Sequence, residues 1–199
     1  MASESSENAF EAHGQPAMTL DRLHPIILQH YNSQYPALFL QEAKEVSAYF
    51  SLGILKNITH IGSTAIPHIT AKPVIDMLVE IENFEKAKDI VRPALCERNY
   101  LYYWRDDRHP PHMMFIKGLD SPTEPTFHLH MAPKEHSLWD RVYFKDYLIS
   151  HASIAKQYER LKIQLAKEYK YDRQSYTDGK AEFVKRITQQ AKEFYKNNG

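Results

Sequence analysis

The hydrophobic pattern of this 199-residue chain changes period near residue 138, and that change limits the available folds more than any other feature. Before it, short apolar and β-branched segments alternate with turns rich in Gly, Pro and polar residues, which predicts strands. After it, apolar residues recur every three to four positions, which predicts amphipathic helices. One helix precedes the strands and one crosses over between them, so the order predicts an α+β domain.

The expected elements form a single domain over residues 19–199, with a sheet-forming part at about 34–132 and C-terminal helices at about 136–197. The polar residues 1–18 lack the apolar stretch of a signal peptide, and we expect them to be a disordered leader. We expect strands at 54–61, 74–81, 100–104, 112–117 and 125–131, and helices at 34–52, 84–95, 138–150, 154–169 and after Asp178, with Ser33, Asn83 and Ser153 as N-caps.

Cysteine content and hydropathy favour a location inside the cell. Cys96 is the one cysteine, so no intramolecular disulfide forms, which fits a reducing compartment. No apolar run approaches the length of about 18 residues that a membrane span needs. We therefore expect a cytoplasmic protein without a membrane partner.

Charge is unevenly distributed although the formal net charge is zero. Residues 141–199 hold 13 Lys and Arg against 7 Asp and Glu, a net charge of +6, and the rest of the chain carries −6. This balance does not favour a general nucleic-acid interface. It does fit a local basic wall that faces a phosphate ligand, and it leaves a small RNA acceptor open. Solvated helix faces are the alternative explanation.

A Gly-Ser pair follows the strand expected at 54–61. Gly62 allows a ligand to approach the backbone closely, and the Ser63 hydroxyl with nearby amides can bind phosphate oxygens. The alternative is a turn that needs Gly62 only for its dihedral angles.

An acid interrupts the buried strand at 74–81. Asp76 is flanked by apolar residues, where an ionised carboxylate is costly unless it is paired or bound to a metal. A structural salt bridge, to Lys72 or an arginine, is the alternative to a metal site.

Two histidines alternate along the strand at 125–131. His128 and His130 are two residues apart, so both side chains should point to the same face, toward a cleft or a metal. The alternative is a pair of hydrogen-bonded histidines on a half-exposed face. His109 and His112 flank prolines and are expected to shape a loop. The chain contains no phosphate-binding P-loop motif, dinucleotide fingerprint, zincin motif or serine-hydrolase elbow.

Several ordered blocks of the sequence resemble the GrpB-like family. The sharpest are His-Ile-Gly-Ser-Thr-Ala-Ile-Pro at 60–67 and Ala-Lys-Pro-Val-Ile-Asp-Met-Leu-Val at 71–79. The resemblance extends over residues 20–191, nearly the whole chain. The other similar positions are Pro36, Phe39, Glu42, 127–130, 144–148, Tyr158, 161–162, 165–166, 172–173, Tyr176, Thr177 and Lys180.

The resemblance implies a nucleotidyltransferase-like fold, a mixed β-sheet with flanking helices and a helical C-terminal half. In that superfamily a Gly-Ser turn holds the triphosphate of a nucleotide, and carboxylates on neighbouring strands hold divalent metals. Gly62, Ser63 and Asp76 match the turn and the first carboxylate.

The carboxylate set departs from the superfamily pattern. Leu78 occupies the second acid position, Glu80 lies off the pattern, and the third strand offers His128 and His130. The resemblance implies Mg²⁺ or Mn²⁺, whereas one aspartate with two imidazoles suits Zn²⁺, Fe²⁺ or Ni²⁺ as well as Mn²⁺. The candidate metal ligands are Asp76, His128 and His130.

The leading hypothesis is a nucleotidyltransferase-like enzyme that binds a nucleoside triphosphate or another phosphorylated small ligand with a divalent metal. Asp76 and His130 are the candidate catalytic residues, with His130 as metal ligand or general base. The sequence predicts neither the acceptor nor the oligomeric state. The candidate phosphate-binding residues are Gly62, Ser63, Thr64, Lys72, Arg141, Lys162 and Lys180.

Three alternatives remain at this point. Leu78 in place of an acid favours a non-catalytic module that binds a nucleotide or phosphate. The Asp76, His128 and His130 set favours a single-metal enzyme. An interaction protein with a buried polar network is the third.

Overall fold

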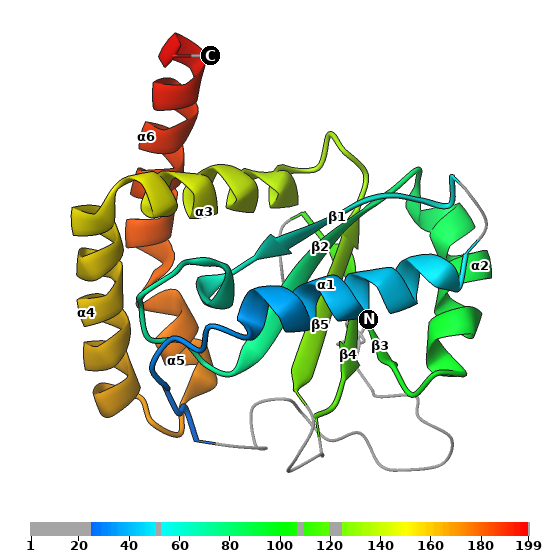
Figure 1. The fold of residues 1–199 in the computed structure, drawn as a ribbon, viewed down its shortest axis with the longest axis horizontal. Coiled ribbons are helices and arrows are strands. Elements are labelled where there is room, and N and C mark those ends of the chain that lie inside the picture. Colours follow the sequence, from blue (N-terminus) through cyan, green and yellow to red (C-terminus); the bar gives the residue numbers. More distant parts are fainter. Residues whose placement is uncertain (1–24, 51–52, 107–109, 120–124, 199) are drawn as a thin grey trace, which may run out of the picture.

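The computed structural model describes residues 25–50, 53–106, 110–119 and 125–198 (Figure 1). The leader expected at residues 1–18 lies outside this part. The strands are β1 (Leu55–Ile61), β2 (Val74–Ile81), β3 (Leu101–Arg105), β4 (His112–Lys117) and β5 (Thr126–Ala132). The helices are α1 (Tyr35–Ala48), α2 (Phe84–Cys96), α3 (Asp140–Ser150), α4 (Ala152–Glu168), α5 (Arg173–Asp178) and α6 (Ala181–Asn198), with 3-10 turns η2 (Ser63–Ala65) and η3 (Ser137–Trp139).

The five strands form one mixed sheet in the order β1-β2-β5-β4-β3. Only β2 and β5 run parallel among these strands, and the other three pairs are antiparallel. The parallel pair aligns Asp76 with His128 and Leu78 with His130. The α+β architecture with a mixed sheet and flanking helices is therefore confirmed, and the two central strands carry the polar residues singled out in the sequence.

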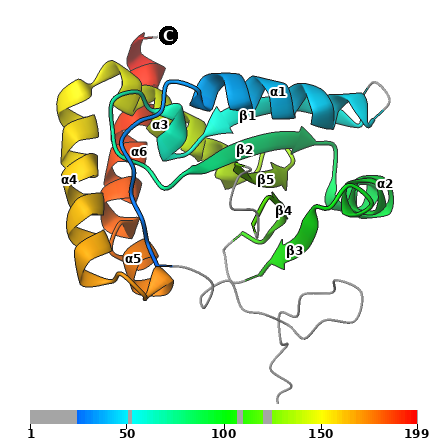
Figure 2. The ribbon, with the colours of Figure 1, turned by 60° about the horizontal axis from the view of Figure 1, so that its bottom comes forward.

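One face of the sheet packs against α1 and α2. In Figure 2, α1 runs along the strands and α2 is seen end-on beside them. Because side chains alternate along a strand, every second residue of β2, β4 and β5 reaches this face. The resulting core is almost wholly apolar and excludes water. Its most buried members are Val46, Ile75, Met77, Val79, Val91, Leu95, Met113, Phe115, Leu129 and Met131.

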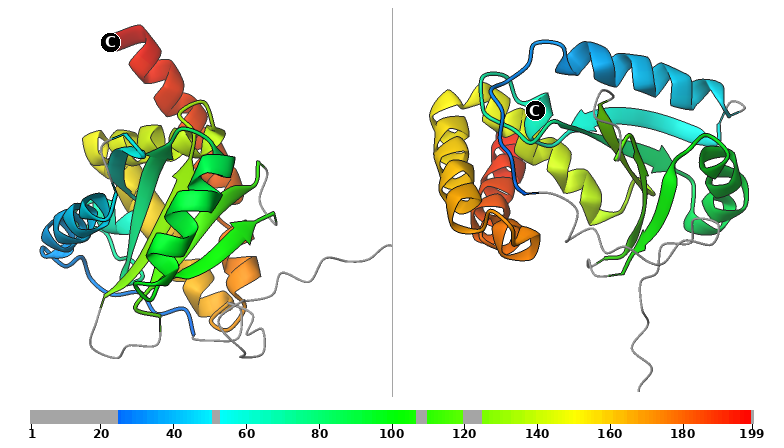
Figure 3. Two further views of the ribbon diagram at one scale, coloured as in Figure 1. Left: turned by 90° about the vertical axis from the view of Figure 1, so that its right-hand side faces the viewer. Right: turned by 90° about the horizontal axis from the view of Figure 1, so that it is seen from below.

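The opposite face of the sheet is covered by the C-terminal helices. Figure 3 shows α1 and α3 on opposite sides of β1 and β2. Ile61, Leu78 and Ala132 pack there against Leu138 and Trp139. A second cluster ties η2 and its following loop to α3, α4 and α6 through Ile66, Ile69, Phe144, Leu148, Ala155, Tyr158 and Ile187. Along their strands, Asp76 lies two residues from Leu78, and His128 and His130 lie four and two residues from Ala132. Their side chains therefore point to the same face as Leu78 and Ala132, toward this helical layer.

Two expected helix caps are wrong, and one is confirmed. Gln34, not Ser33, is the N-cap of α1, because Asn32 Oδ1 already accepts the Gln34 N–H and Pro36 fits the first turn. Helix α4 starts at Ala152 after His151, so Ser153 lies inside it. Asn83 caps α2 by accepting the Lys86 N–H at 2.9 Å.

The lengths of two helical segments also differ from expectation. Helix α1 ends at Ala48, not at residue 52, and Gly53 beyond it has φ +95°. The short helix α5 was not expected; Asp172 caps it by accepting the Ser175 N–H. Helix α6 continues past α3 toward the C-terminus (Figure 1). Within the described ranges, no helix is both long and apolar enough to cross a membrane.

Candidate functional site

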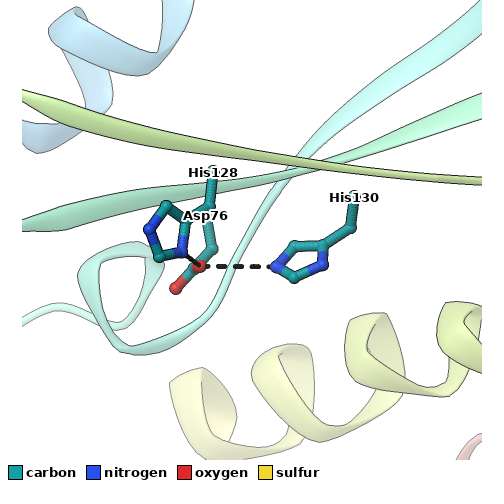
Figure 4. Close-up of side chains that lie close together, drawn as sticks. All are labelled: Asp76, His128 and His130. Atoms are coloured by element: carbon teal, nitrogen blue, oxygen red, sulfur yellow. Dashed lines mark ion pairs between the residues drawn. The ribbon is translucent and has the colours of Figure 1, made fainter. Parts of the chain in front are cut away.

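The structure brings one carboxylate and two imidazoles together on the face of the sheet that the C-terminal helices cover. Asp76 comes from β2, and His128 and His130 come from the adjacent parallel strand β5. Asp76 Oδ1 lies 3.4 Å from His128 Nδ1 and 3.6 Å from His130 Nε2 (Figure 4). Among the described residues, this is the one group of three acidic, His or Cys side chains close enough to share a metal ion.

The separations match those of ligands around a small ion. A hydrogen bond between a ring N–H and a carboxylate is about 2.7–3.2 Å long. Ligands about 2.0–2.2 Å from a tetrahedral ion stand roughly 3.3–3.6 Å from one another. The two distances from Asp76 Oδ1, 3.4 and 3.6 Å, lie in the second range. Both imidazole nitrogens thus stand at ligand-like distances from Asp76 Oδ1, and all three atoms lie within 4.8 Å of one another.

Gly62 leaves the room that the Asp76 side chain occupies. It ends β1 with φ +75°, a conformation that suits glycine. A Cβ at this position would stand 2.4 Å from Asp76 Oδ2 and 3.0 Å from Asp76 Cβ. The Gly-Ser turn is thus in direct contact with the carboxylate, and Gly62 is needed for close packing as well as for backbone conformation.

Electrostatics keep Asp76 and His130 in their metal-binding protonation states. Burial alone would raise the pKa of Asp76, but the facing rings of His128 and His130 hold that pKa well below its usual range. Burial, with help from Arg141, lowers the pKa of His130 to about 4 against the opposing pull of Asp76. An ionised carboxylate and a neutral imidazole are the forms that bind metals.

His112 also belongs to this cluster, which the sequence analysis did not expect. It is the first residue of β4, as the strand expected at 112–117 requires, and is 2% exposed, so it does not shape the loop before that strand. His112 Nε2 lies 3.1 Å from His130 Nδ1. The sequence indicated this position, because His112 alternates with Met114 and Ile116 along an apolar strand and so points to the same face as they do. His109 lies outside the described residues.

Both nitrogens of His130 are already engaged. Nε2 faces Asp76 and Nδ1 faces His112, and the side chain is nearly buried. A general base must reach the proton it removes. This arrangement favours His130 as a metal ligand over His130 as a general base.

A cavity of about 650 Å³ opens beside Asp76 and His128, between the sheet edge and helices α3–α6. Its lining includes five basic and three acidic side chains, so its walls are net positive. Of the candidate phosphate-binding residues, all seven lie along it: Gly62, Ser63, Thr64, Lys72, Arg141, Lys162 and Lys180. These residues come from η2 and its N-cap, the loop before β2, helices α3 and α4, and the turn between α5 and α6. They are up to 118 positions apart in the sequence.

Two tyrosine rings, named above as family-like positions but given no role in the site, contact the lysines. The Lys162 ammonium lies 4.9 Å from the ring centre of Tyr158, and the Lys72 and Lys180 ammonium groups lie 5.7 and 4.1 Å from that of Tyr176. Such cation–π contacts hold an ammonium group in place without neutralising its charge. Burial raises the pKa of Tyr158 to about 12, so this phenol stays neutral.

Burial makes two of the lysines unusually acidic. It lowers the pKa of Lys162 to about 7, with Lys72 adding to the effect, and Glu159 opposes it. It lowers the pKa of Lys72 to about 8, with Arg173 adding to the effect, and Asp76 opposes it. Lys162 Nζ donates a hydrogen bond to the Thr70 carbonyl. An anion in the cavity would compensate the charge of both ammonium groups.

Thr64 has a structural contact in addition to its place on the cavity wall. Its hydroxyl donates to the Val74 carbonyl at 2.9 Å and lies 3.1 Å from His60 Nε2. The side chain is 1% exposed. Thr64 therefore fixes η2 against the start of β2, and Ser63 is the more accessible hydroxyl of the turn.

Comparison with known proteins relates most of the chain to GrpB proteins. Residues 25–190 match the family model described as GrpB protein. Glutamate-rich protein GrpB of Alkalihalophilus pseudofirmus is 32% identical over 167 residues, covering 81% of this chain and 93% of that protein. The crystal structure of conserved protein GrpB from Enterococcus faecalis has a TM-score of 0.74 and 28% identity, covering 85% of this chain and 99% of that chain.

Two bacterial relatives are longer than the matched region. A UPF0157 protein of Pseudomonas aeruginosa is 35% identical over 155 residues, which are 77% of this chain and 62% of that protein. UPF0157 protein YqkA of Bacillus subtilis is 32% identical over 167 residues, which are 83% of this chain and 47% of that protein. The chain thus spans less than two thirds of either relative.

Proposed function

This chain belongs to the GrpB family, and we propose that it binds one divalent transition-metal ion at Asp76, His128 and His130 and acts on a phosphorylated small molecule held beside that ion. The observation that carries the proposal is the spacing of the three ligand atoms, 3.4 and 3.6 Å from Asp76 Oδ1 to the two imidazoles, at the edge of a basic cavity.

The ligand chemistry favours a transition metal over magnesium. Mg²⁺ prefers an octahedron of oxygen atoms. Imidazole nitrogens suit Zn²⁺, Mn²⁺, Fe²⁺ or Ni²⁺. The second acid of a two-metal site has no counterpart, because Leu78 fills that position and is completely buried in the apolar layer. We therefore propose a single-metal site.

The cavity walls favour an anionic ligand of at least two phosphoryl groups. Lys72, Lys162, Lys180 and Ser63 line the same cavity, and the Lys72 and Lys180 ammonium groups both lie over the Tyr176 ring. Lys72 and Lys162 are both desolvated, so each gains from a compensating negative charge. Several such contacts to phosphate oxygens form strong charge-assisted hydrogen bonds.

The reaction that fits these parts is transfer of a nucleotidyl group from a nucleoside triphosphate, as in the nucleotidyltransferase superfamily. The ion would supply Lewis-acid polarisation of a phosphoryl oxygen. Ser63 and the turn amides would orient the phosphate chain, and Lys72 with Lys162 would stabilise the charge on the departing phosphates. The helical layer over the site would limit access of water.

A non-catalytic module for nucleotide or phosphate binding is the second candidate. It is favoured by one observation, the replacement of the second acid by buried Leu78. Such a module would bind the same ligands without converting them. Release of pyrophosphate in the presence of a nucleotide and metal separates the two functions.

The test is the thermal stability of metal-free protein against a panel of nucleoside triphosphates with Mg²⁺, Mn²⁺ or Zn²⁺. A ligand that binds only the folded state raises the melting temperature. We expect Mn²⁺ or Zn²⁺ to raise it alone, and a nucleotide to raise it further. Ser63→Ala should remove the nucleotide effect and keep the metal effect.

Ser153→Ala is the matched control, because Ser153 is exposed on α4 and lies away from the cavity. It should behave as the unmodified protein does. The absence of a shift with any metal and any nucleotide would overturn the proposed function.

A further inference from the structure

The metal ligand His130 is in contact with a second buried histidine instead of the carbonyl or carboxylate that usually supports such a ligand. His112 Nε2 lies 3.1 Å from His130 Nδ1, and the ring centres are 5.3 Å apart. Partners of this kind fix the orientation and tautomer of a metal-ligating histidine. His112 comes from β4 and His130 from β5, so the contact joins two adjacent strands on one face of the sheet.

A hydrogen bond between two neutral imidazoles allows two arrangements, since one ring must donate and the other must accept. In the first, His112 Nε2–H donates to His130 Nδ1, and His130 Nε2–H points at Asp76. In the second, His130 Nδ1–H donates to His112 Nε2, and the His130 Nε2 lone pair points at Asp76. Each ring carries one N–H in both arrangements, so the pair changes tautomer without gaining or losing a proton.

A bound ion selects the second arrangement. Only a nitrogen with its lone pair free binds a metal, and Nε2 is the nitrogen of His130 that lies near Asp76 and His128. His112 must then accept at Nε2 and carry its own hydrogen on Nδ1. Without an ion, the negative charge of Asp76 favours the first arrangement, because the positive end of His130 Nε2–H then points at the carboxylate.

The surroundings of His112 leave one of its two nitrogens without a partner. Its Nδ1 is buried and has no hydrogen-bond partner among the described residues. Buried polar atoms are normally satisfied, so an unpaired one calls for an explanation outside packing. The nearby His136 cannot take the same role, because its nitrogens contact the Pro111 carbonyl and the Leu138 N–H.

We propose that His112 is a positioning residue for the metal site, which accepts the Nδ1–H of His130 and so holds the His130 Nε2 lone pair toward the ion. The inference rests on the proposed metal site and adds the residue that fixes the orientation and tautomer of one of its ligands, His130.

The first test is Zn²⁺ affinity, measured calorimetrically on metal-free protein. His112→Phe keeps a ring of similar size but removes the acceptor, and we expect it to weaken Zn²⁺ binding by about 10- to 100-fold. His112→Gln places an amide oxygen at about the reach of Nε2, and we expect it to restore most of the affinity. Phe115→Leu, on the opposite face of β4, should lower stability without changing Zn²⁺ affinity.

The second test is the tautomer of His130 in the Zn²⁺-bound protein, read from the imidazole nitrogen resonances. We expect a protonated Nδ1 and a metal-bound Nε2. Unchanged Zn²⁺ affinity in His112→Phe, or a metal-bound Nδ1, would overturn the inference while leaving the metal site intact. A wild-type protein that binds no metal would overturn the proposed function together with it.

Discussion

Gly62 and Asp76 lie so close together that a methyl group on Gly62 would stand 2.4 Å from Asp76 Oδ2. The contact joins the proposed phosphate-binding turn to the strand that carries a proposed metal ligand. A change in one residue therefore changes the position of the other, and the two halves of the proposed site can be tested as a unit.

We predict that Gly62→Ala destabilises the protein and weakens metal binding. With φ +75° and ψ −173°, Gly62 lies in a backbone region essentially restricted to glycine, which costs another residue about 1–3 kcal/mol. Displacing the Asp76 side chain adds roughly 1–3 kcal/mol. Gly53→Ala is the matched control, because Gly53 also has a positive φ, +95°, but meets nothing within 4 Å. Chemical denaturation and metal titration of both variants check this. The prediction would be contradicted if Gly62→Ala lost no more stability than Gly53→Ala and kept the metal affinity of the unmodified protein.

Lys162 provides a prediction about stability and pH. Its pKa is lowered to about 7 in the folded protein and is ordinary, near 10.5, in the unfolded chain. Between these values the unfolded chain binds the extra proton, so stability should rise with pH from 7 to 9, on the order of 1 kcal/mol per pH unit. Lys162→Met should flatten this rise.

The matched control for that prediction is Lys167→Met, since Lys167 lies exposed on the same helix α4. It should keep the slope of the unmodified protein. Urea denaturation at several pH values measures both. A slope that persists in Lys162→Met would show that Lys162 is not the residue responsible.

The same lysines predict how anion binding depends on pH. Lys162 and Lys72 attract an anion only when protonated, and burial brings their pKa values to about 7 and about 8. Affinity should therefore be highest below pH 7 and should fall by about tenfold or more toward pH 9. Sulfate is a suitable probe, because its own charge is constant in this range. Affinity that stays level or rises with pH would contradict the assignment of these lysines to the anion site.

Much of the fold could be predicted from sequence pattern, because short-range physics determines it. The strands at 74–81 and 112–117 have the expected bounds, and Asn83 caps α2 as expected. Where two neighbouring residues compete to cap a helix, tertiary contacts decide. Asn32 rather than Ser33 contributes the side-chain contact at the start of α1, and α5 is too short for hydrophobic periodicity to reveal.

The site was harder to predict, because it is assembled across the sheet. The alternation of His128 and His130 places both on one face, but only the parallel pairing of β2 with β5 brings them to Asp76. The role of His112 depends on the pairing of β4 with β5, which periodicity does not give. The depressed pKa of Lys162 likewise follows from its burial against Tyr158 and not from its place in an amphipathic helix.

The most direct test of the central claim is a calorimetric titration of Zn²⁺ into metal-free protein, comparing the unmodified chain with Asp76→Asn and His128→Ala. We predict one ion per chain, and an affinity loss on the order of 100-fold or more in each variant, by extension from the smaller effect of losing a supporting partner. His30→Ala, which removes an exposed histidine, should bind as the unmodified chain does. Absence of binding, or equal binding in Asp76→Asn and the unmodified chain, would contradict the metal site and the function built on it.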